Sequence, residues 1–396
     1  MSRIIDIAKE ISSGLTPLRS NLEYWQNGTI PWLKTEQIGE YRIKTTNEYV
    51  TQKALESTGL KLYPKNTISV AMYGEGKTRG NVSIIDYPMT TNQACCNIVV
   101  NEDIVEPFYL YYFLKTQYHN LRQLSSGVRK NLNSNDIKNY KINLPNKTIQ
   151  KNIVNFLYSI DEKIELNNKI NSKLENLAKT LYDYWFVQFD FPDENERPYK
   201  SSGGKMIYSK ELKREIPVIF EQKELQDFCN IFTGKKDVKM TVENGKYPFF
   251  SCAPDPLKSN DYIFDGNAIL VAGNGSYTGR VSYYKGKFDL YQRTYACTLK
   301  NTDKDLIPFL YYFMKFFFEP QYKGGTHGSA IPYIVLGDLA NLGIPFNSVI
   351  TNKFNNVAKP ILKAYFKNSE ENKRLIQIRD FLLPMLMNGQ ISITAE

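Results

Sequence analysis

The chain has 396 residues and a mass of 45.8 kDa, which at roughly one domain per 150 residues predicts two or three domains. Fifty lysines and arginines outnumber 41 acidic residues, and the net charge of +9 permits binding to a polyanion such as nucleic acid. No apolar run approaches the roughly 18 residues of a membrane span, and the five cysteines form no CxxC pair that would suggest a zinc ribbon. We therefore expect a cytoplasmic protein with reduced thiols.

Residues 1–145 are predicted to form the first domain, which has a strand-rich core and one short helix. Apolar and β-branched runs between turn formers predict strands at Thr67–Ala71, Val82–Ile85 and Asn97–Val100. A proline near the start of Pro107–Gln117 predicts a short helix there. The predicted class of this domain is mixed α/β.

Residues 146–205 are predicted to form a long helix followed by a linker. From Ile153, apolar residues recur every seven residues and again four residues after each step, which is the a/d heptad pattern of a helix that packs along a seam. The centre of this pattern is polar, with Asn167 and Asn171, and apolar residues resume at Leu174. The last part, Asp190–Lys205, is rich in proline, serine, glycine and charged residues, which predicts a linker.

Residues 206–345 are predicted to form a second domain of the same class. Strands are predicted at Ala268–Ala272 and Val281–Tyr284, and a short helix over Pro308–Phe317. The order of these elements is that of the first domain.

Residues 346–396 carry a second helix with the same heptad pattern. Its middle layer is also polar, with Asn368 and Asn372, and Leu375 follows. Since both helices have asparagines in the same central heptad, we expect them to pair, with the asparagines hydrogen-bonded across the seam and fixing the register. The spacing alone does not choose between parallel and antiparallel pairing, and the alternative is that each helix lies on its own domain.

The two halves of the chain repeat each other with a period of about 200 residues, which is the pattern of an internal duplication. The matches keep their order and nearly their spacing. The matched segments are Asn27–Trp32 with Asn244–Phe249, Asn66–Ala71 with Asn267–Ala272, Leu110–Lys115 with Leu310–Lys315, and Ile142–Pro145 with Leu342–Pro345.

Corresponding loops of the two halves collect side chains that suit DNA. Arginine and lysine can read guanine or contact phosphates, and asparagine and glutamine can read adenine. The candidate DNA-binding residues of the first half are Lys77, Arg79, Asn92, Gln93, Arg129 and Lys130, and those of the second half are Asn274, Tyr277, Arg280, Arg293 and His327.

Evidence for catalysis is weak in this sequence. Ala71–Thr78 fits a loose form of the phosphate-binding loop of nucleotide hydrolases, but Arg79–Asp86 is strand-like where that loop requires a helix. The corresponding segment Ala272–Arg280 lacks the Gly-Lys-Thr. Neither methyltransferase nor nuclease motifs are evident, so we predict no catalytic and no metal-binding residue.

Several segments, in consistent order, carry a resemblance to a known family. They are Ala71–Gly74, Thr78–Gly80, Thr90–Cys96, Leu144–Val154, Ser159–Asn168, Tyr184–Pro192, Pro198–Gly204, Glu211–Pro217 and Arg379–Gly389. In these segments the chain resembles the specificity (S) subunits of type I restriction–modification enzymes. It departs from the family at Val218–Phe220, where a tryptophan is common, and at Thr351–Lys353, where a Glu-Gln pair is common.

The resemblance implies two target recognition domains joined by two long helices that pair as an antiparallel coiled coil. It implies a non-catalytic protein in which each domain binds one half of a bipartite asymmetric DNA site. The helices would dock two methylation subunits, which use S-adenosylmethionine to methylate adenine N6, and restriction subunits would add ATP- and Mg-dependent chemistry. No cofactor is expected in this chain itself.

Three alternatives remain open from the sequence. The chain could serve a methylation-only or type IIB-like system in place of a restricting one. From other classes, it could be a nucleotide hydrolase that uses Gly76-Lys77-Thr78, or a scaffold that binds proteins and no nucleic acid.

Overall fold

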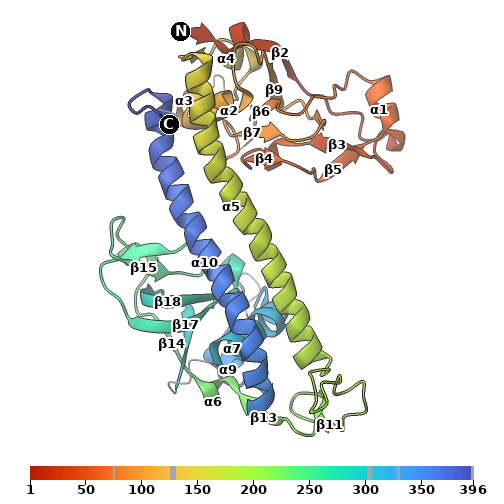
Figure 1. Cartoon of the computed structure of the whole chain (residues 1–396), viewed down its shortest axis with the longest axis vertical. Helices are drawn as coiled ribbons and strands as arrows, with labels where there is room; N and C mark the ends of the chain where they lie inside the picture. The colour runs from red at the N-terminus through yellow and green to blue at the C-terminus, as the bar shows by residue number, and fades with distance from the viewer. Residues whose placement is uncertain (75, 125–130, 301–305, 326, 328–330, 394–396) are drawn as a thin grey trace. The chain divides into compact units, whose positions relative to one another are not determined.

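The computed structural model describes residues 1–74, 76–124, 131–300, 306–325, 327 and 331–393 and divides into two compact units (Figure 1). Unit 1 consists of Met1–Asn167 with Glu370–Glu396, and unit 2 is Asn168–Ser369. Each unit therefore contains one part of α5 (Lys147–Tyr182) and one part of α10 (Ser348–Met387). In the part of the chain that the structure describes, no helix is long and apolar enough to span a membrane.

The described residues of unit 1 form mainly short strands, together with four short helices. Its strands are β1 (Ser2–Arg3), β2 (Ala8–Ser13), β3 (Ile30–Leu33), β4 (Arg42–Ile43), β5 (Glu48–Val50), β6 (Ile68–Ala71), β7 (Val82–Ile85), β8 (Thr90–Thr91), β9 (Cys95–Val100) and β10 (Lys141–Ile142). Its helices besides the long ones are α1 (Gln52–Ser57), α2 (Pro107–Thr116), α3 (Tyr118–Gln123) and α4 (Ser134–Lys138), with 3-10 turns η1 (Ile4–Ile7), η2 (Leu22–Tyr24) and η3 (Thr35–Gln37).

The main sheet of unit 1 has the strand order β2-β9-β6-β7-β4, and a smaller sheet has the order β5-β3-β8. β6 pairs antiparallel with both β7 and β9, while β4 pairs parallel with β7. The residues of α2 from Tyr109 to Leu114 are almost fully buried against this sheet and against α5 and α10. The core of unit 1 thus joins the sheet, α2 and the two long helices.

The described residues of unit 2 form one six-stranded sheet and two sheets of two strands each. Its strands are β11 (Met206–Ser209), β12 (Arg214–Pro217), β13 (Glu221–Glu224), β14 (Cys229–Thr233), β15 (Tyr247–Phe250), β16 (Leu257–Ser259), β17 (Phe264–Ala272), β18 (Val281–Leu290), β19 (Thr294–Leu299) and β20 (Gly343–Phe346). Its helices are α6 (Leu225–Phe228), α7 (Ile307–Phe313), α8 (Glu319–Tyr322) and α9 (Leu336–Ala340), with π turns η4 (Asp183–Val187) and η8 (Met314–Phe318) and 3-10 turns η5 (Val238–Met240) and η6 (Gly275–Tyr277).

The large sheet has the strand order β14-β19-β17-β18-β15-β16, and its first four strands repeat the order β2-β9-β6-β7 of unit 1. β18 pairs antiparallel with β17 over most of its length and then parallel with β15. In unit 1 two separate strands make the corresponding pairings: β7 pairs antiparallel with β6, and β8 pairs parallel with β3. The internal repeat seen in the sequence is therefore a repeat of the fold.

Helices α5 and α10 run in opposite directions in unit 1 (Figure 1). Asn167 donates from Nδ2 to Oδ1 of Asn372 over 2.9 Å, and Arg379 Nη1 lies 2.6 Å from Oδ1 of Asp161. As the residue number falls along α5 it rises along α10, which defines an antiparallel pair. Leu375 is partly exposed between these two contacts.

The same orientation holds in unit 2. Asn368 donates from Nδ2 to Oδ1 of Asn171 over 3.0 Å, and Trp185 packs on Phe354 with ring centroids 5.8 Å apart. Leu174 packs against the same core. The predicted fold class, two strand-rich domains with two long antiparallel helices, is confirmed.

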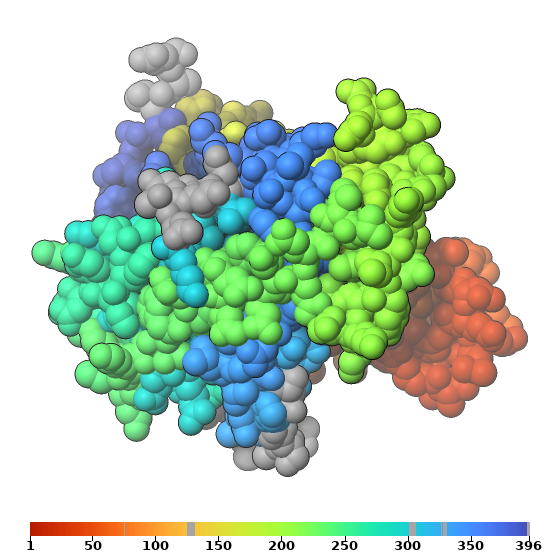
Figure 2. Space-filling model, turned by 90° about the horizontal axis from the view of Figure 1, so that it is seen from below, coloured from red at the N-terminus to blue at the C-terminus, as the bar shows by residue number. Residues whose placement is uncertain are grey.

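The segment predicted to be a linker packs more closely than its composition suggests. Phe189 and Phe191 are buried against Phe220. The Phe189 ring meets it edge-on with centroids 5.6 Å apart, and the Phe191 ring stacks on it at 5.4 Å. Residues 188–220 form part of the face of unit 2 turned to the viewer in Figure 2, where they are yellow-green to green. The proline and glycine content of this segment predicts a linker, although its phenylalanines pack into an aromatic cluster with Phe220.

Candidate nucleic-acid interface

Two turns of unit 1 meet where strands β6, β7 and β9 of its main sheet begin or end, and this row of strand ends is called the turn edge of the unit. The first, residues 72–81, joins β6 to β7 and carries Lys77 and Arg79, and the second, residues 92–94, joins β8 to β9 and carries Asn92 and Gln93. The two turns are held together because the backbone N–H of Met72 donates to the carbonyl of Ala94 over 2.9 Å. The structure thus brings these four predicted residues to one edge.

The β6–β7 turn is anchored from below by α3. The Tyr118 hydroxyl donates to the carbonyl of Lys77, and Nη1 of Arg122 donates to the carbonyl of Arg79, each over 2.9 Å. The side chain of Lys77 is exposed and that of Arg79 is half-buried. The anchors Tyr118 and Arg122 lie about 40 positions away in sequence, so sequence spacing offers no signal for them.

In the second turn the two predicted residues differ in their freedom. Oδ1 of Asn92 accepts from the backbone N–H of Ala94 and from the thiol of Cys95, each over 3.1 Å. Asn92 therefore shapes the turn and leaves only its amide nitrogen for a ligand. Gln93 is exposed, and its Oε1 accepts from the hydroxyl of Thr16.

The geometry argues against a phosphate-binding loop at Gly76-Lys77-Thr78. Such a loop cradles phosphates because a helix begins directly after it. Here the turn leads into β7, which begins at Val82 and pairs with β6 as a hairpin.

The corresponding turns of unit 2 are residues 273–280, between β17 and β18, and residues 291–293, between β18 and β19. The backbone N–H of Gly273 donates to the carbonyl of Arg293 over 2.9 Å, and the N–H of Ile334 donates to the carbonyl of Gly273 over 3.0 Å. A Cβ added at Gly273 would lie 2.3 Å from the Arg293 carbonyl oxygen, so this close approach requires glycine. Three chain segments are therefore locked together at this edge.

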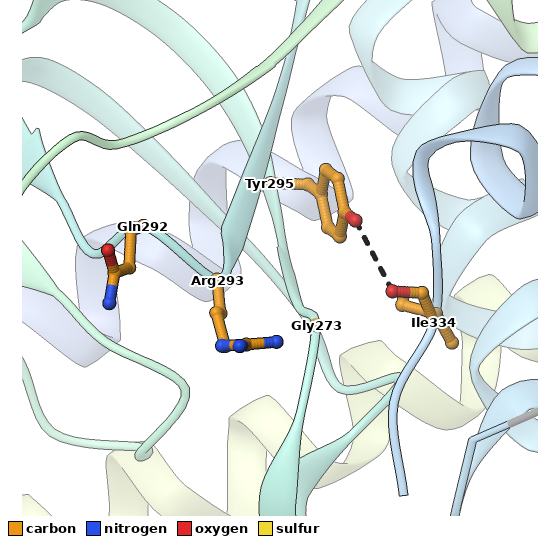
Figure 3. Close-up of a pocket in the computed structure, with 5 residues that line it drawn as sticks. All are labelled: Gly273, Gln292, Arg293, Tyr295 and Ile334. Carbon is orange, nitrogen blue, oxygen red and sulfur yellow. Dashed lines mark hydrogen bonds between the residues drawn. The ribbon is translucent and has the colours of Figure 1, made fainter. Parts of the chain in front are cut away.

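A hollow of about 240 Å³ opens where these segments meet (Figure 3). It is lined by Gly273, Gln292, Arg293, Tyr295 and Ile334, and the Tyr295 hydroxyl donates to the Ile334 carbonyl over 3.2 Å. In this view the guanidinium of Arg293 turns toward Gly273. Gln292 and Arg293 are both exposed, so their donors are available to a ligand.

The residues of the β17–β18 turn are held to different degrees. Nη2 of Arg280 donates to the carbonyl of Ala253 over 2.7 Å, and partial burial lowers the pKa of this guanidinium. Asn274 accepts at Oδ1 from the thiol of Cys252 over 3.1 Å. The Tyr277 side chain forms no hydrogen bond with a described residue, and Tyr277 is 48% exposed.

Of the remaining predicted residues, the structure describes His327. His327 is exposed and stacks on Tyr333, with ring centroids 5.3 Å apart, and its Nε2 lies 3.6 Å from Oδ2 of Asp338. Arg129 and Lys130 lie outside the residues that the structure describes.

Comparison with known proteins identifies the family of this chain. The sequence model of the type I restriction modification DNA specificity domain matches residues 1–176 and again residues 217–378. Each match takes in one copy of the repeat.

Similar proteins agree with this match. The chain is 28% identical over 425 residues to the type I restriction enzyme MjaIX specificity subunit of Methanocaldococcus jannaschii, covering 99% of this chain and 93% of that protein. It is 31% identical over 185 residues to the EcoDI specificity subunit of Escherichia coli, covering 45% and 40%. The crystal structure of a type I restriction–modification S subunit from M. genitalium shares the fold, with a TM-score of 0.62 at 18% identity over 100% and 96% of the two chains.

In this family the specificity subunits are not catalytic, and the catalytic activity lies in partner subunits. The duplicated fold, with its matching turn edges, is accordingly a duplicated DNA-recognition fold. The chain belongs to the DNA specificity subunits of type I restriction–modification systems and is a non-catalytic, sequence-recognising component.

Proposed function

We propose that each strand-rich domain of this chain reads one half of a bipartite, asymmetric DNA sequence. The observation that supports this most directly is the repeated strand order, which places the same two turns at the same edge of both units. The side chains on these edges differ, with Lys77 and Gln93 in one and Tyr277 and Arg293 in the other. Different side chains on the same scaffold are suited to reading different half-sites.

The candidate DNA-binding residues divide into two classes. Lys77, Gln93, Tyr277, Arg293 and His327 have exposed side chains and are proposed as the primary contacts to bases and phosphates. A second set shapes the turns and contributes the groups that internal contacts leave over. This set is Arg79, Asn92, Asn274 and Arg280, and Arg129 and Lys130 stay in the proposal on sequence grounds alone.

The long helices are proposed to dock two methylation subunits, which bind S-adenosylmethionine and methylate adenine N6. Large apolar side chains are exposed on both helices, including Leu166 and Leu177 on α5 and Phe381 on α10, which is 64% exposed. Exposed apolar side chains on paired helices are typical of a surface that a protein partner covers. Restriction subunits, which use ATP and Mg, would complete a cleaving complex in the cytoplasm.

The domain boundaries belong to the same proposal. Residues 1–145 and 206–345 are proposed as the recognition domains, and residues 146–205 and 346–396 as the docking helices with their flanking segments. The test is to express the chain with its methylation subunits in a host that lacks adenine methylation and to sequence the methylated genome. A single two-part asymmetric motif with an unread gap is expected, and an undivided or palindromic motif would contradict the proposal.

A further inference from the structure

A second hollow lies in unit 1 between the β6–β7 turn and the junction of α2 with α3. Its volume is about 350 Å³. Among the described residues that line it are two lysines and no acidic residue. The lining is Gly39, Lys77, Gly80, Asn81, Val82, Lys115 and Tyr118.

Lys115 has an unusual setting for a lysine. Its side chain is half-buried, with Nζ 5.8 Å from the centre of the Tyr111 ring, and no described residue forms an ion pair with it. Burial lowers the pKa of its ammonium group, and Arg379 acts in the same direction. The two carboxylates that act on it electrostatically, Asp161 and Asp380, both bind Arg379.

The repeat shows what a neutralised version of this lysine looks like. In unit 2 the corresponding residue, Lys315, lies 3.0 Å from Oε2 of Glu319. The same Oε2 accepts from the backbone N–H of Val281 over 2.9 Å, which holds the carboxylate in place. In the matching segment of unit 1 the residue four positions after Lys115 is His119, which is exposed. Unit 1 has kept the lysine and lacks the carboxylate.

We infer that this hollow is an anion subsite in which Lys115, together with Lys77, binds one backbone phosphate of DNA. The inference rests on the proposed function and extends it to a residue that lies outside the loops. Lys77 belongs to the turn proposed to contact DNA and also lines the hollow. A DNA strand that contacts Lys77 would therefore lie next to the hollow. A lysine ammonium binds phosphate as a point charge with no preference for the base attached.

The experiment uses the chain in complex with its methylation subunits. Lys115→Met removes the charge and keeps the aliphatic stem, while His119→Glu, at an exposed position, supplies the carboxylate that unit 2 has. Lys315→Met is the matched control, since its ammonium is already paired. The affinity for a duplex with the methylated motif and for an unrelated duplex is measured over a range of salt concentrations.

For Lys115→Met and for His119→Glu we expect the slope of log K against log salt, which is negative, to become shallower by about one on both duplexes. The methylated motif should stay the same, because a phosphate contact carries no sequence information. Lys315→Met should leave the slope at the wild-type value.

Three results would overturn the inference. One is an unchanged slope in both unit 1 variants, and another is a changed motif, which would make Lys115 a base reader. The third is loss of methylation subunits from the complex, which would assign the hollow to an acidic group of a protein partner. The proposed function fails separately, if the wild-type complex itself selects no sequence.

Discussion

At the scale of single residues, the exposed side chains of the recognition edges have to be separated from those that build the turns. Arg280 and Arg293 illustrate the difference, because the first donates to the carbonyl of Ala253 while the second is exposed at a hollow. The sequence predicted both as DNA contacts, since both are cations in matching loops. The distinction depends on a carbonyl 27 positions away, which no local pattern reveals.

Arg293→Ala is expected to weaken specific DNA binding by about 1–3 kcal/mol and to relax the choice of base at one position of one half-site. The thermal unfolding temperature should not change, because the side chain is exposed. Arg197→Ala is the control, since Arg197 is also exposed in unit 2 but pairs with Asp193, away from this edge. Binding titrations on variants of the DNA motif measure the effect, and wild-type affinity together with wild-type discrimination among these motifs would remove Arg293 from the site.

A buried ion pair in unit 1 makes a second residue-scale prediction. Asp161 is 3% exposed and is held by Nη1 of Arg379 and by the hydroxyl of Tyr112, which donates over 2.7 Å. Arg379→Met leaves the carboxylate buried without its cation. The free energy of unfolding should therefore fall by about 3–5 kcal/mol. Denaturant unfolding of the variant, compared with Arg374→Met at an exposed position of the same helix, measures this. Equal stabilities for the two variants would contradict it.

At the scale of elements, the heptads predicted that the two long helices pair because the pattern is local and regular. The asparagine layer could also be predicted from the spacing, but the antiparallel direction came only from the family resemblance, since a central polar layer meets its twin in either orientation. The packing of Phe191 was missed because this residue lies in a segment whose prolines and glycines predict a linker, and Phe189 directly precedes that segment. Contacts between segments that are distant in sequence could not be predicted where neither the internal repeat nor a heptad pattern indicated them.

The asparagine layer is expected to fix register at some cost in stability. In unit 1, Asn372→Ala removes the oxygen that accepts from Asn167, so a buried donor loses a partner and the free energy of unfolding should fall by about 1–3 kcal/mol. Replacing both residues with leucine should restore most of that loss, since no polar group is then stranded. Urea unfolding of the two variants and of the surface control Lys373→Ala tests this. A double variant less stable than Asn372→Ala would count against the argument.

At the scale of the whole molecule, the duplication is the feature from which the functional account follows. The period of about 200 residues predicted two copies of one unit, and the shared strand order of β2-β9-β6-β7 and β14-β19-β17-β18 confirms it. What the repeat does not predict is which side chains in each copy are free to bind. The sequence shows His119 four positions after Lys115 and Glu319 four positions after Lys315, but only the fold shows that Lys315 pairs with Glu319 while Lys115 lines a hollow.

The most direct test of the central claim, that each domain reads its own half of the site, is an exchange of one domain. Residues 1–145 are replaced by the corresponding domain of a relative, and the genome methylated by the resulting complex is sequenced. We expect a motif in which one half is new and the other half is that of the unaltered chain. A motif changed in both halves, from a complex that still assembles and methylates, would contradict independent reading by the two domains.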